Sequence, residues 1–440
     1  MKIMKFGGTS VGRPERMQQV KDLISIGDEK KIVVLSALAG TTNILVSIGD
    51  ALAVGKKELA KQKIDALHDH YHNFQLELLG TKAGRSKATQ IIKEHFEFLN
   101  IILRISFNEA INKDILAQGE LLSTKLFYTL LEELELAAVF LPALEFMSID
   151  ENDEPELSKI REKLESILSR YPADTIFITQ GYICKNHRNE VDNLKRGGSD
   201  YTASLLGAAV SASVVEIWTD IDGMHNNDPR IVDKTKPIAQ LSFDEAAELA
   251  YFGAKILHPA SIWPAQLNNV PVKLLNTMAP EAPGTTITGL QQTNGIKAVA
   301  AKDGITAIKI KSSRMLLAYG FLRKVFEIFE KYKTSIDMIT TSEVAISLTL
   351  DDVSHLKEIT NELQKLGKVE VDQDLTIICI VGNAIMEQKG VLNKIMQHLE
   401  NFPLRMVSYG GSRHNVSVLV DARDKKEALQ SLNNGLFDFE

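Results

Sequence analysis

Lys5-Phe6-Gly7-Gly8-Thr9-Ser10 ends a short apolar run close to the N-terminus. We expect an extended segment that stops at the two glycines, which lack the Cβ atom that keeps a backbone away from a ligand. Backbone N–H groups at such a turn can approach an anion closely. Thr9 and Ser10 add hydroxyl groups, and Lys5 adds a positive charge. The stretch therefore predicts a polyphosphate-binding turn after a strand.

Two common nucleotide-binding motifs are absent. In a Walker A loop the lysine follows the glycines, whereas here it precedes them. The chain contains no G-x-G-x-x-G, which removes the main support for a dinucleotide-binding domain. An ordinary glycine turn with a solvated lysine remains the alternative interpretation of the stretch.

The composition is that of a globular protein with several domains. The 440 residues are 44% hydrophobic and 24% charged, which predicts about two to four domains. The net charge of −7 argues against nonspecific nucleic-acid binding. The two cysteines, Cys184 and Cys379, lie far apart and form neither a disulfide framework nor a zinc site. Without a signal peptide or an apolar run near the ~20 residues of a membrane span, we expect a cytoplasmic protein with no membrane partner.

Strand-like and helix-like segments alternate through the first part of the chain. Buried strands are expected at 3–6, 32–35, 175–179, 214–218 and 270–275. A long, mostly helical insertion is expected from about 56 to 134. The alternation predicts an α/β sandwich around a largely parallel sheet. Pro280 and Pro283 then interrupt the pattern, and a second region begins near Gly295.

The second region repeats itself with an offset of seventy residues. Three pairs of segments align at this offset: 306–310 with 376–380, 320–326 with 390–396, and 346–348 with 416–418. Strand, helix and strand recur in the same order in both copies. The repeat predicts two small α+β modules of the ferredoxin-like type.

Four further segments place polar groups where an open parallel sheet binds ligands. They are Ser36–Asn43, Arg196–Asp200, Trp218–Gly223 with the following Asp228-Pro229-Arg230, and Gly253–Pro259, which contains Lys255. Taken singly, each has a plain alternative: a helix cap, an Asp/Gly turn or a solvent-facing lysine. Together they indicate phosphoryl transfer onto a small charged substrate. A serine hydrolase is poorly supported, because G-x-S-x-G is absent.

In this order, the Lys5, Arg196, Trp218 and Gly253 motifs resemble those of aspartokinases, and the resemblance covers essentially the whole chain. It implies an amino-acid-kinase three-layer sandwich over residues 1–290. Two ferredoxin-like ACT modules would follow at 295–374 and 375–440, and the two could be interleaved. The implied reaction converts L-aspartate and ATP to 4-phospho-L-aspartate, the first step towards lysine, threonine and methionine. Since the chain ends soon after the second module, no fused homoserine dehydrogenase is expected.

The resemblance also implies roles for individual residues. Lys5 and the amides of Gly7 and Gly8 would hold the transferred phosphoryl group, and Asp200 would orient Lys5. The residues expected to bind aspartate are Ser36, Thr42, Glu120, Arg196 and Ser199, with Arg196 on the α-carboxylate and Glu120 on the ammonium. The residues expected to contact ATP are Thr219, Asp220, His225, Arg230 and Lys255. No protein metal site is expected, because Mg²⁺ would be bound mainly through the ATP phosphates.

Three departures from the family pattern stand out. Lys195 replaces a glycine before the Arg-Gly-Gly, His225 replaces a common tyrosine, and Asn226-Asn227 replace small residues before Asp228. We expect these departures to affect contacts with the nucleotide and not the reaction itself.

The first module resembles the effector site of lysine-sensitive aspartokinases, which implies feedback inhibition by lysine. The expected effector-binding residues are Met315, Ala318, Gly320, Phe321, Leu322, Ser335, Ile336, Asp337 and Ser342. Asp337 would pair with the effector's ammonium, and Ala318 departs from the usual serine. The plain alternative is that Phe321, Leu322 and Ile336 are core residues and Asp337 is a surface charge.

Two competing functions remain open at this point. Another amino-acid kinase, acting on glutamate or acetylglutamate, is disfavoured by Glu120 and the paired modules. A non-catalytic amino-acid sensor is disfavoured by the presence of Lys5, Asp200 and Lys255. Because ACT modules commonly pair across subunits, we expect a homodimer or a larger assembly.

Overall fold

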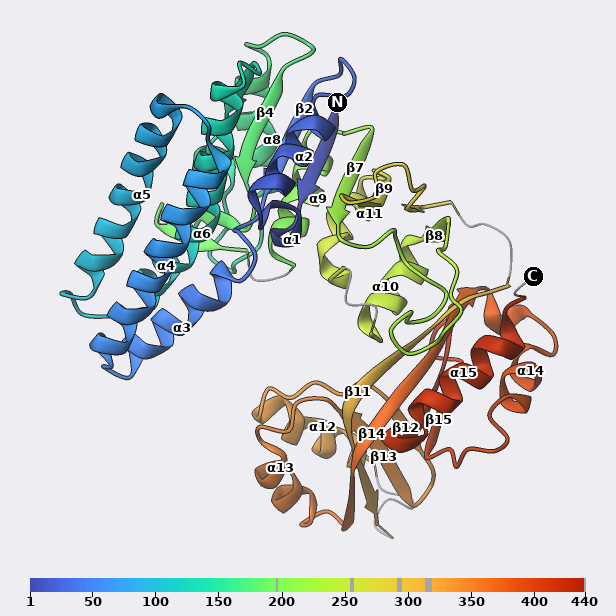
Figure 1. Cartoon of the computed structure of the whole chain (residues 1–440). Helices are drawn as coiled ribbons and strands as arrows, with labels where there is room; N and C mark the ends of the chain where they lie inside the picture. Colours follow the sequence, from blue (N-terminus) through green and yellow to red (C-terminus); the bar gives the residue numbers. More distant parts are fainter. Residues whose placement is uncertain (195–196, 254–256, 291–294, 313–318, 439–440) are drawn as a thin grey trace. The chain divides into compact units, whose positions relative to one another are not determined.

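The computed structural model describes residues 1–194, 197–253, 257–290, 295–312 and 319–438. It divides into two compact units, which are described separately here (Figure 1). Unit 1 comprises residues 1–224, 239–243 and 257–290. Unit 2 comprises residues 225–238 and 244–256 and everything from 291 onward. Two short segments before residue 290 therefore group with the second part of the chain.

Unit 1 is built on one sheet whose eight described strands follow the order β3-β4-β2-β1-β7-β9-β10-β8. The strands are β1 (Lys2–Phe6), β2 (Lys31–Leu35), β3 (Ala138–Phe140), β4 (Ile176–Gln180), β7 (Val214–Thr219), β8 (Gln240–Ser242), β9 (Val272–Asn276) and β10 (Thr285–Thr288). Neighbouring strands run parallel except β9 and β10. The predicted largely parallel sheet is confirmed.

Helices lie between the strands along the chain. They are α1 (Gly8–Val11), α2 (Pro14–Ile24), α3 (Thr41–Ala53), α4 (Lys57–Leu78), α5 (Lys82–Ile102), α6 (Glu109–Glu133), α7 (Ala143–Phe146), α8 (Leu157–Leu168), α9 (Gly198–Ala209) and α11 (Trp263–Leu267). A short hairpin joins β5 (Ile183–Lys185) and β6 (Val191–Asn193). The expected helical insertion corresponds to α4, α5 and α6.

The alternation of side chains along β1 explains why helices cover both faces of the sheet. Met4 and Phe6 point into the hydrophobic cluster that α2 to α6 form with the sheet. Lys5 lies on the opposite face, where it meets Asp200 of α9. One strand thus contributes to the core on one side and to a polar site on the other.

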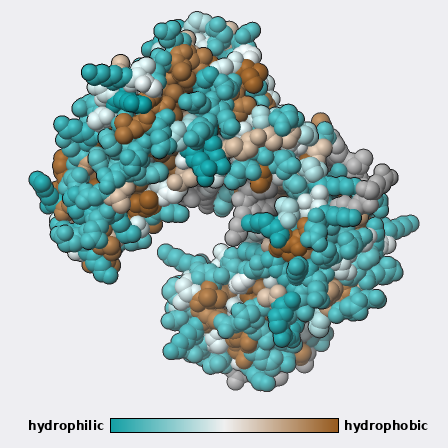
Figure 2. All heavy atoms as spheres, in the orientation of Figure 1, coloured by the Kyte–Doolittle hydropathy of each residue, from teal (hydrophilic) through white to brown (hydrophobic). Residues whose placement is uncertain are grey.

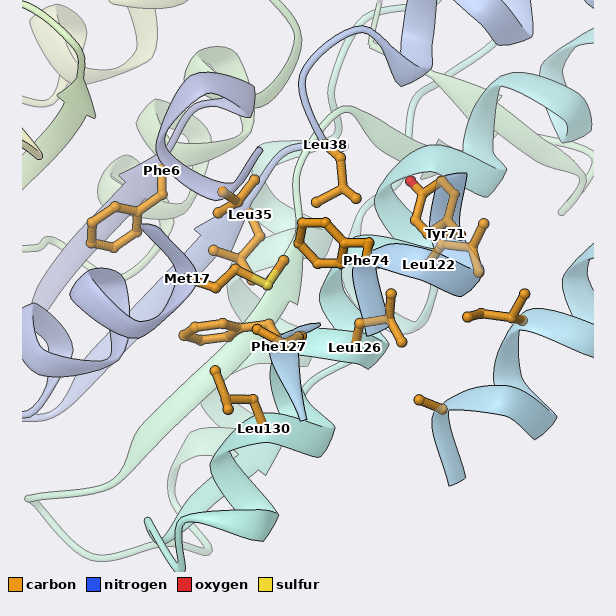
Figure 3. Packing of buried hydrophobic residues seen from close by; sticks show 14 of the residues in the cluster. Phe6, Met17, Leu35, Leu38, Tyr71, Phe74, Leu122, Leu126, Phe127 and Leu130 are labelled. Carbon is orange, nitrogen blue, oxygen red and sulfur yellow. The ribbon is translucent and has the colours of Figure 1, made fainter. Parts of the chain in front are cut away.

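The cluster behind β1 is the main core of unit 1. Figure 3 shows Phe6 of β1, Met17 of α2, Phe74 of α4 and Phe127 of α6 packed closely together. Phe6 also stacks on Trp218 of β7, with ring centroids 5.8 Å apart. This packing fixes the end of β1, where the Lys5 stretch begins.

Phe127→Ala is expected to lower the free energy of unfolding by about 3–5 kcal/mol, because a fully buried ring is lost and a cavity remains. Urea unfolding followed by circular dichroism measures the change. Ile101→Ala, at a side chain that is 57% exposed, is the control and is expected to stay within about 1 kcal/mol of wild type.

Unit 2 carries the repeated region. Its six described strands follow the order β12-β13-β11-β14-β16-β15, and all neighbouring strands are antiparallel. The strands are β11 (Gly295–Lys311), β12 (Ile339–Thr341), β13 (Ala345–Leu350), β14 (Lys368–Asn383), β15 (Met406–Tyr409) and β16 (Asn415–Asp421). The helices are α12 (Phe321–Lys331), α13 (Leu356–Leu363), α14 (Val391–Gln397) and α15 (Lys425–Leu436).

The two halves of unit 2 repeat each other in detail. Gly320 and Gly390, which align at the seventy-residue offset, are the N-cap residues of α12 and α14 and have φ values of +79° and +82°. Both positions need a left-handed backbone, which glycine adopts without a steric penalty. The long strands β11 and β14 pair along nearly their whole length. Each of them therefore contributes to both halves, while the boundary between the modules stays a prediction.

Helix α10 (Phe243–Tyr251) begins in unit 1 and continues in unit 2. The chain re-enters unit 1 at Leu257. Both ends of the segment that contains α10 are thus covalently connected to unit 1.

The face shown in Figure 2 is mostly hydrophilic, with hydrophobic residues in small separate groups. No described helix combines the length and the apolar character needed to cross a membrane.

Candidate functional site

The carboxyl ends of four parallel strands meet at one edge of the sheet in unit 1. Phe6 pairs with Leu35 on one side and with Trp218 on the other, and Leu35 pairs with Gln180. The loops that follow these strands are therefore neighbours, although they are far apart in the sequence. Ligands bind at this edge in open parallel sheets.

Lys5 lies at this edge in an ion pair. Its Nζ is 2.6 Å from Oδ1 of Asp200, and the two side chains are 10% and 15% exposed. Asp200 belongs to the first turn of α9. A Cβ atom on Gly7 would lie 3.3 Å from the Lys5 Nζ, so glycine leaves room for the ammonium. The ion pair holds one charge of each sign beside the strand ends.

The two glycines after β1 differ in their contacts. The N–H of Gly7 donates to the carbonyl of Trp218 at 3.2 Å, so this amide is already engaged in holding β1 to β7. The N–H of Gly8, as the first residue of α1, has no partner within its own helix. A Cβ atom on Gly8 would lie 2.9 Å from the carbonyl oxygen of Ala37, which requires glycine at this position.

A cavity of about 400 Å³ opens beside these groups. It brings together five residues predicted from the sequence: Gly8, Ser36, Thr42, Glu120 and Ser199. The other lining residues are Ala37, Leu38, Ala39, Gly40, Asn43, Tyr182 and Gly198. Arg196 and Lys195 lie outside the described residues.

Glu120 is the buried carboxylate of this cavity. It is 4% exposed and comes from α6, which approaches the loop after β2 at Gly119. A Cβ atom on that glycine would lie 2.8 Å from the Cβ of Ala37. The N–H of Ala37 donates to Oε1 of Glu120 at 3.3 Å, and Oε2 is buried without a hydrogen-bond partner among the described residues. Burial raises the pKa of Glu120 to about 8.

The start of α9 forms another wall of the cavity through Gly198 and Ser199. Gly197 has a left-handed backbone, and a Cβ atom there would lie 2.5 Å from the Cβ of Ser261. Gly181, after β4, leaves similar room, since its Cβ would lie 2.3 Å from Ser199. The glycines of the Arg-Gly-Gly stretch thus allow α9 to begin against two neighbouring loops.

The sequence analysis missed Tyr182. This residue lines the cavity and has a φ of +67°, which is rare for a residue with a side chain. Burial raises its pKa to about 12, so its hydroxyl is protonated near neutral pH. The signal available in the sequence was its place two residues after a buried strand, next to Gly181.

The residues predicted to contact ATP are divided between the two units. In unit 1, Thr219 is the last residue of β7 and Asp220 follows it, and the Thr219 hydroxyl donates to Asp220 at 3.2 Å. His225 and Arg230 belong to unit 2. Arg230 donates two hydrogen bonds to Asp228, at 2.9 and 2.7 Å. Lys255 lies outside the described residues.

The substitution of Asn226-Asn227 for small residues has a structural consequence in unit 2. Both side chains are buried and lie within hydrogen-bonding distance of Asn433 on α15, at 3.4 Å. The Oδ1 atom of Asn226 accepts a bond from the N–H of Lys236 at 2.6 Å. The asparagines therefore anchor their loop within unit 2.

The predicted effector residues lie around α12 and β12. Phe321 is part of a hydrophobic core cluster, and Ile336 packs against it. Leu322 is 40% exposed. Gly320 is the N-cap of α12, Ser335 is exposed, and Ser342 forms a local turn with Ala345. Met315 and Ala318 lie outside the described residues.

The alternative interpretation of Asp337 as a charge on the protein surface is wrong. Its side chain is only 1% exposed and pairs with Lys302.

Among the described residues, no group of three or more His, Cys, Asp or Glu side chains is placed to hold a metal ion.

Comparisons with known proteins match this organisation. Residues 1–276 match the model of the amino acid kinase family, and residues 378–436 match an ACT domain. The lysine-sensitive aspartokinase 3 of Escherichia coli (strain K12) is 34% identical over 99% of both chains. The chloroplastic aspartokinase 3 of Arabidopsis thaliana is also 34% identical, over 99% of this chain and 81% of its own.

Solved structures give the same result. The crystal structure of E. coli aspartokinase III in complex with aspartate and ADP (R-state) superimposes with a TM-score of 0.85 at 33% identity, over 100% of both chains. The structure of the same enzyme in complex with lysine and aspartate (T-state) superimposes with a TM-score of 0.84 at 33% identity.

Proposed function

Because this chain belongs to the aspartokinase family, we propose that the cavity in unit 1 holds the aspartate that the enzyme phosphorylates. The reaction is the ATP-dependent conversion of L-aspartate to 4-phospho-L-aspartate, with feedback inhibition by lysine. The individual roles given below are proposals for the residues of this chain.

The observation that supports the substrate site most strongly is the Oε2 atom of Glu120, which is buried with no hydrogen-bond partner in the part of the chain that the structure describes. A buried carboxylate without a partner is unfavourable, and an ammonium group placed beside it removes that penalty. Aspartate has such a group at one end and carboxylates elsewhere. Glu120 therefore binds the α-ammonium, and this orients the β-carboxylate away from α6.

The carboxylate end of aspartate needs donors, and other residues that line the cavity supply them. Ser199 and Gly198 form the start of α9, where backbone N–H groups and the helix dipole favour an anion. Arg196 precedes them in the sequence and would add a planar pair of donors for the α-carboxylate. Thr42 and Ser36 offer hydroxyl groups on the rim.

No general base is required for the reaction. The attacking β-carboxylate is already ionised near neutral pH, as the ordinary pKa of an aspartate side chain shows. Catalysis then depends on bringing this anion close to the γ-phosphate and on neutralising the charge that accumulates between them. The ammonium group of Lys5, which lies at the strand ends, neutralises this charge. Asp200 positions Lys5 through the 2.6 Å ion pair.

The nucleotide is ATP, because the related E. coli enzyme binds ADP. Thr219, Asp220, His225, Arg230 and Lys255 remain the proposed contacts for it. Mg²⁺ is part of the proposal. Asp200 is paired with Lys5, and Glu120, the acidic residue that lines the cavity, is assigned to the substrate's ammonium. We therefore assign Mg²⁺ to the triphosphate and to water, the ligands this small ion prefers.

Regulation and assembly belong to unit 2. Asp337 and the neighbouring effector residues would bind lysine, and the paired ACT modules would join subunits into a homodimer or a larger assembly. A cytoplasmic location remains a prediction.

The affinity for aspartate is expected to increase with pH. The carboxyl of Glu120 has a pKa of about 8 in the free enzyme, so it is largely protonated at pH 6.5 and cannot pair with an ammonium. As the pH rises towards 8.5 the carboxylate forms, and the KM for aspartate should fall about tenfold. Steady-state kinetics at constant ionic strength measure the profile. A flat KM profile would contradict an ionisable partner for the ammonium.

The reaction itself is tested by trapping the acyl phosphate with hydroxylamine, with and without lysine. Aspartate hydroxamate that depends on ATP and is suppressed by lysine is the expected result. If hydroxamate forms but lysine does not suppress it, the proposed kinase reaction stands and the proposed lysine site is rejected. Pure, folded protein that forms no hydroxamate would reject the reaction.

A further inference from the structure

Two donors of unit 2 converge on the carboxylate of Asp337, which lies between α12 and β12. The Tyr251 hydroxyl donates to Oδ1 at 2.7 Å, and Nζ of Lys302 binds the same oxygen at 2.8 Å. Lys302 also pairs with Asp351 at 2.8 Å and lies 4.5 Å from the centre of the Tyr251 ring. These contacts connect the end of α10 to β11 and to the first module.

The cluster of these four side chains lacks one positive charge. It contains the carboxylates of Asp337 and Asp351 but only one ammonium, that of Lys302. The Oδ2 atom of Asp337 is buried without a hydrogen-bond partner among the described residues. Burial and the nearby Asp337 and Asp351 carboxylates raise the pKa of Tyr251, so this residue is a neutral donor and does not change the balance. The cluster therefore attracts an additional ammonium, and the open oxygen of Asp337 is where such a group would first bind before it competes with Lys302 for the carboxylate.

The carboxylate is covered in the ligand-free chain. The side chain of Asp337 is 1% exposed, and a free amino acid cannot reach it without a displacement of neighbouring groups. Tyr251 and Lys302 are bound to this carboxylate. A ligand that binds Asp337 must therefore compete with them for its oxygen atoms.

We propose that Lys302 is a built-in competitor for the effector's ammonium at Asp337, and that Tyr251 transmits the outcome of this competition to α10. The inference rests on the proposed function, because it takes lysine as the effector. In the free enzyme Tyr251 and Lys302 hold α10 against the first module. Bound lysine takes over Asp337, and the end of α10 is released.

Chain connectivity explains how this release affects catalysis. Tyr251 is the last residue of α10, and the chain returns to unit 1 at Leu257. Lys255, proposed to contact ATP, lies in the short connection. In sequence, Tyr251 is separated by only five residues from the point where the chain re-enters unit 1. Because coupling between two sites is reciprocal, binding of ATP, which Lys255 is proposed to contact, should in turn weaken lysine binding.

The second module supports assigning the effector contact to the first. Ser412, which aligns with Ser342, donates to Glu248 of α10 at 2.7 Å. The position that aligns with Asp337 is Val407, which carries no charge. The second module therefore also contacts α10, but it has no carboxylate for which an ammonium could compete.

The test compares lysine binding and lysine inhibition in the full-length chain and in three variants. Lys302→Met removes the internal ammonium, and Tyr251→Phe removes one hydroxyl while keeping the ring under Lys302. Lys309→Met, an exposed lysine on the same strand β11, is the matched control. Isothermal titration calorimetry gives the lysine Kd independently of activity, and the hydroxamate assay gives the maximal inhibition.

Lysine is expected to bind about tenfold more tightly to both cluster variants, because a hydrogen bond or ion pair to a buried charge no longer has to be broken. Lys309→Met should match wild type. In Tyr251→Phe, saturating lysine should also inhibit less than in wild type, because the link to α10 is missing with and without the effector.

An unchanged or weaker lysine affinity in both cluster variants would overturn the competition. A tighter affinity with full inhibition in Tyr251→Phe would overturn the role of Tyr251. Wild-type chain that phosphorylates aspartate but does not bind lysine would reject the effector site and this inference, while the kinase reaction stands.

Discussion

Lys5→Met is expected to lower kcat about 10²- to 10³-fold while the Kd for aspartate changes less than about threefold. The ammonium of Lys5 lies at the strand ends beside the cavity and is proposed to neutralise charge that develops on the transferred phosphoryl group. Removing one such donor from an enclosed site typically costs this much in turnover. The substrate's ammonium and α-carboxylate are proposed to bind elsewhere in the cavity, so ground-state binding should be largely kept.

Two further variants separate this effect from loss of structure. Lys5→Met leaves Asp200 without its ion-pair partner, which alone can destabilise the fold. The double variant Lys5→Met/Asp200→Asn removes that orphan charge and should remain equally inactive. Lys2→Met, on the same strand and paired with Glu29 and Glu216, is the control with near-normal kcat. Near-normal turnover in Lys5→Met, measured through ADP release, would exclude the phosphoryl role.

Glu120→Gln is expected to raise the KM for aspartate about 100-fold, with a smaller effect on kcat. The substitution keeps the shape of the side chain but removes the charge that pairs with the ammonium, and loss of one partner from a buried charge pair costs on the order of 2–5 kcal/mol. Glu132→Gln, an exposed residue of the same helix that pairs with Lys87, is the control. Aspartate kinetics at pH 8.5, where Glu120 is ionised in wild type, give the largest contrast.

The same substitution should not destabilise the protein. The pKa of Glu120 is raised in the folded chain above its ordinary value of 4.5, to about 8. The folded state thus retains a proton that the unfolded state loses, and wild type loses stability as the pH rises through this window. Glu120→Gln avoids that loss and should unfold at a higher temperature than wild type at pH 8.5. A lower Tm there would mean that Glu120 has a structural role that the cavity does not reveal.

Most of the fold was predictable because its signals are local. The segments that form β2 and β4 are mainly apolar, and all their residues are buried, as expected of parallel strands covered on both faces. The seventy-residue repeat identified two similar modules, since each copy needs its own glycine cap and amphipathic helix. The assignment of 225–238 and 244–256 to unit 2 was not predictable. It depends on contacts such as that between Asn226 and Asn433, and the pattern of hydrophobic residues along the sequence does not predict contacts of this kind.

The candidate site was predictable in part. Gly8, Ser36, Thr42, Glu120 and Ser199 were named from motifs, and they line one cavity. The engaged amide of Gly7 was not foreseen, because its acceptor is the carbonyl of Trp218, on a strand that is distant in sequence. Tyr182 was missed because its place two residues after a buried strand was not used, and its positive φ becomes visible only in the folded backbone.

The sequence by itself determined the class of fold, the repeat, the family and the chemical groups available, since these depend on residue types and their spacing along the chain. The tertiary structure alone decided which of these groups meet. It placed Glu120 against the N–H of Ala37, 83 residues away, with one oxygen that has no hydrogen-bond partner among the residues described. It also placed Tyr251 on Asp337, 86 residues away. Hydrogen bonds and ion pairs act over a few ångströms in space, and a chain of 440 residues brings together partners that sequence spacing does not identify.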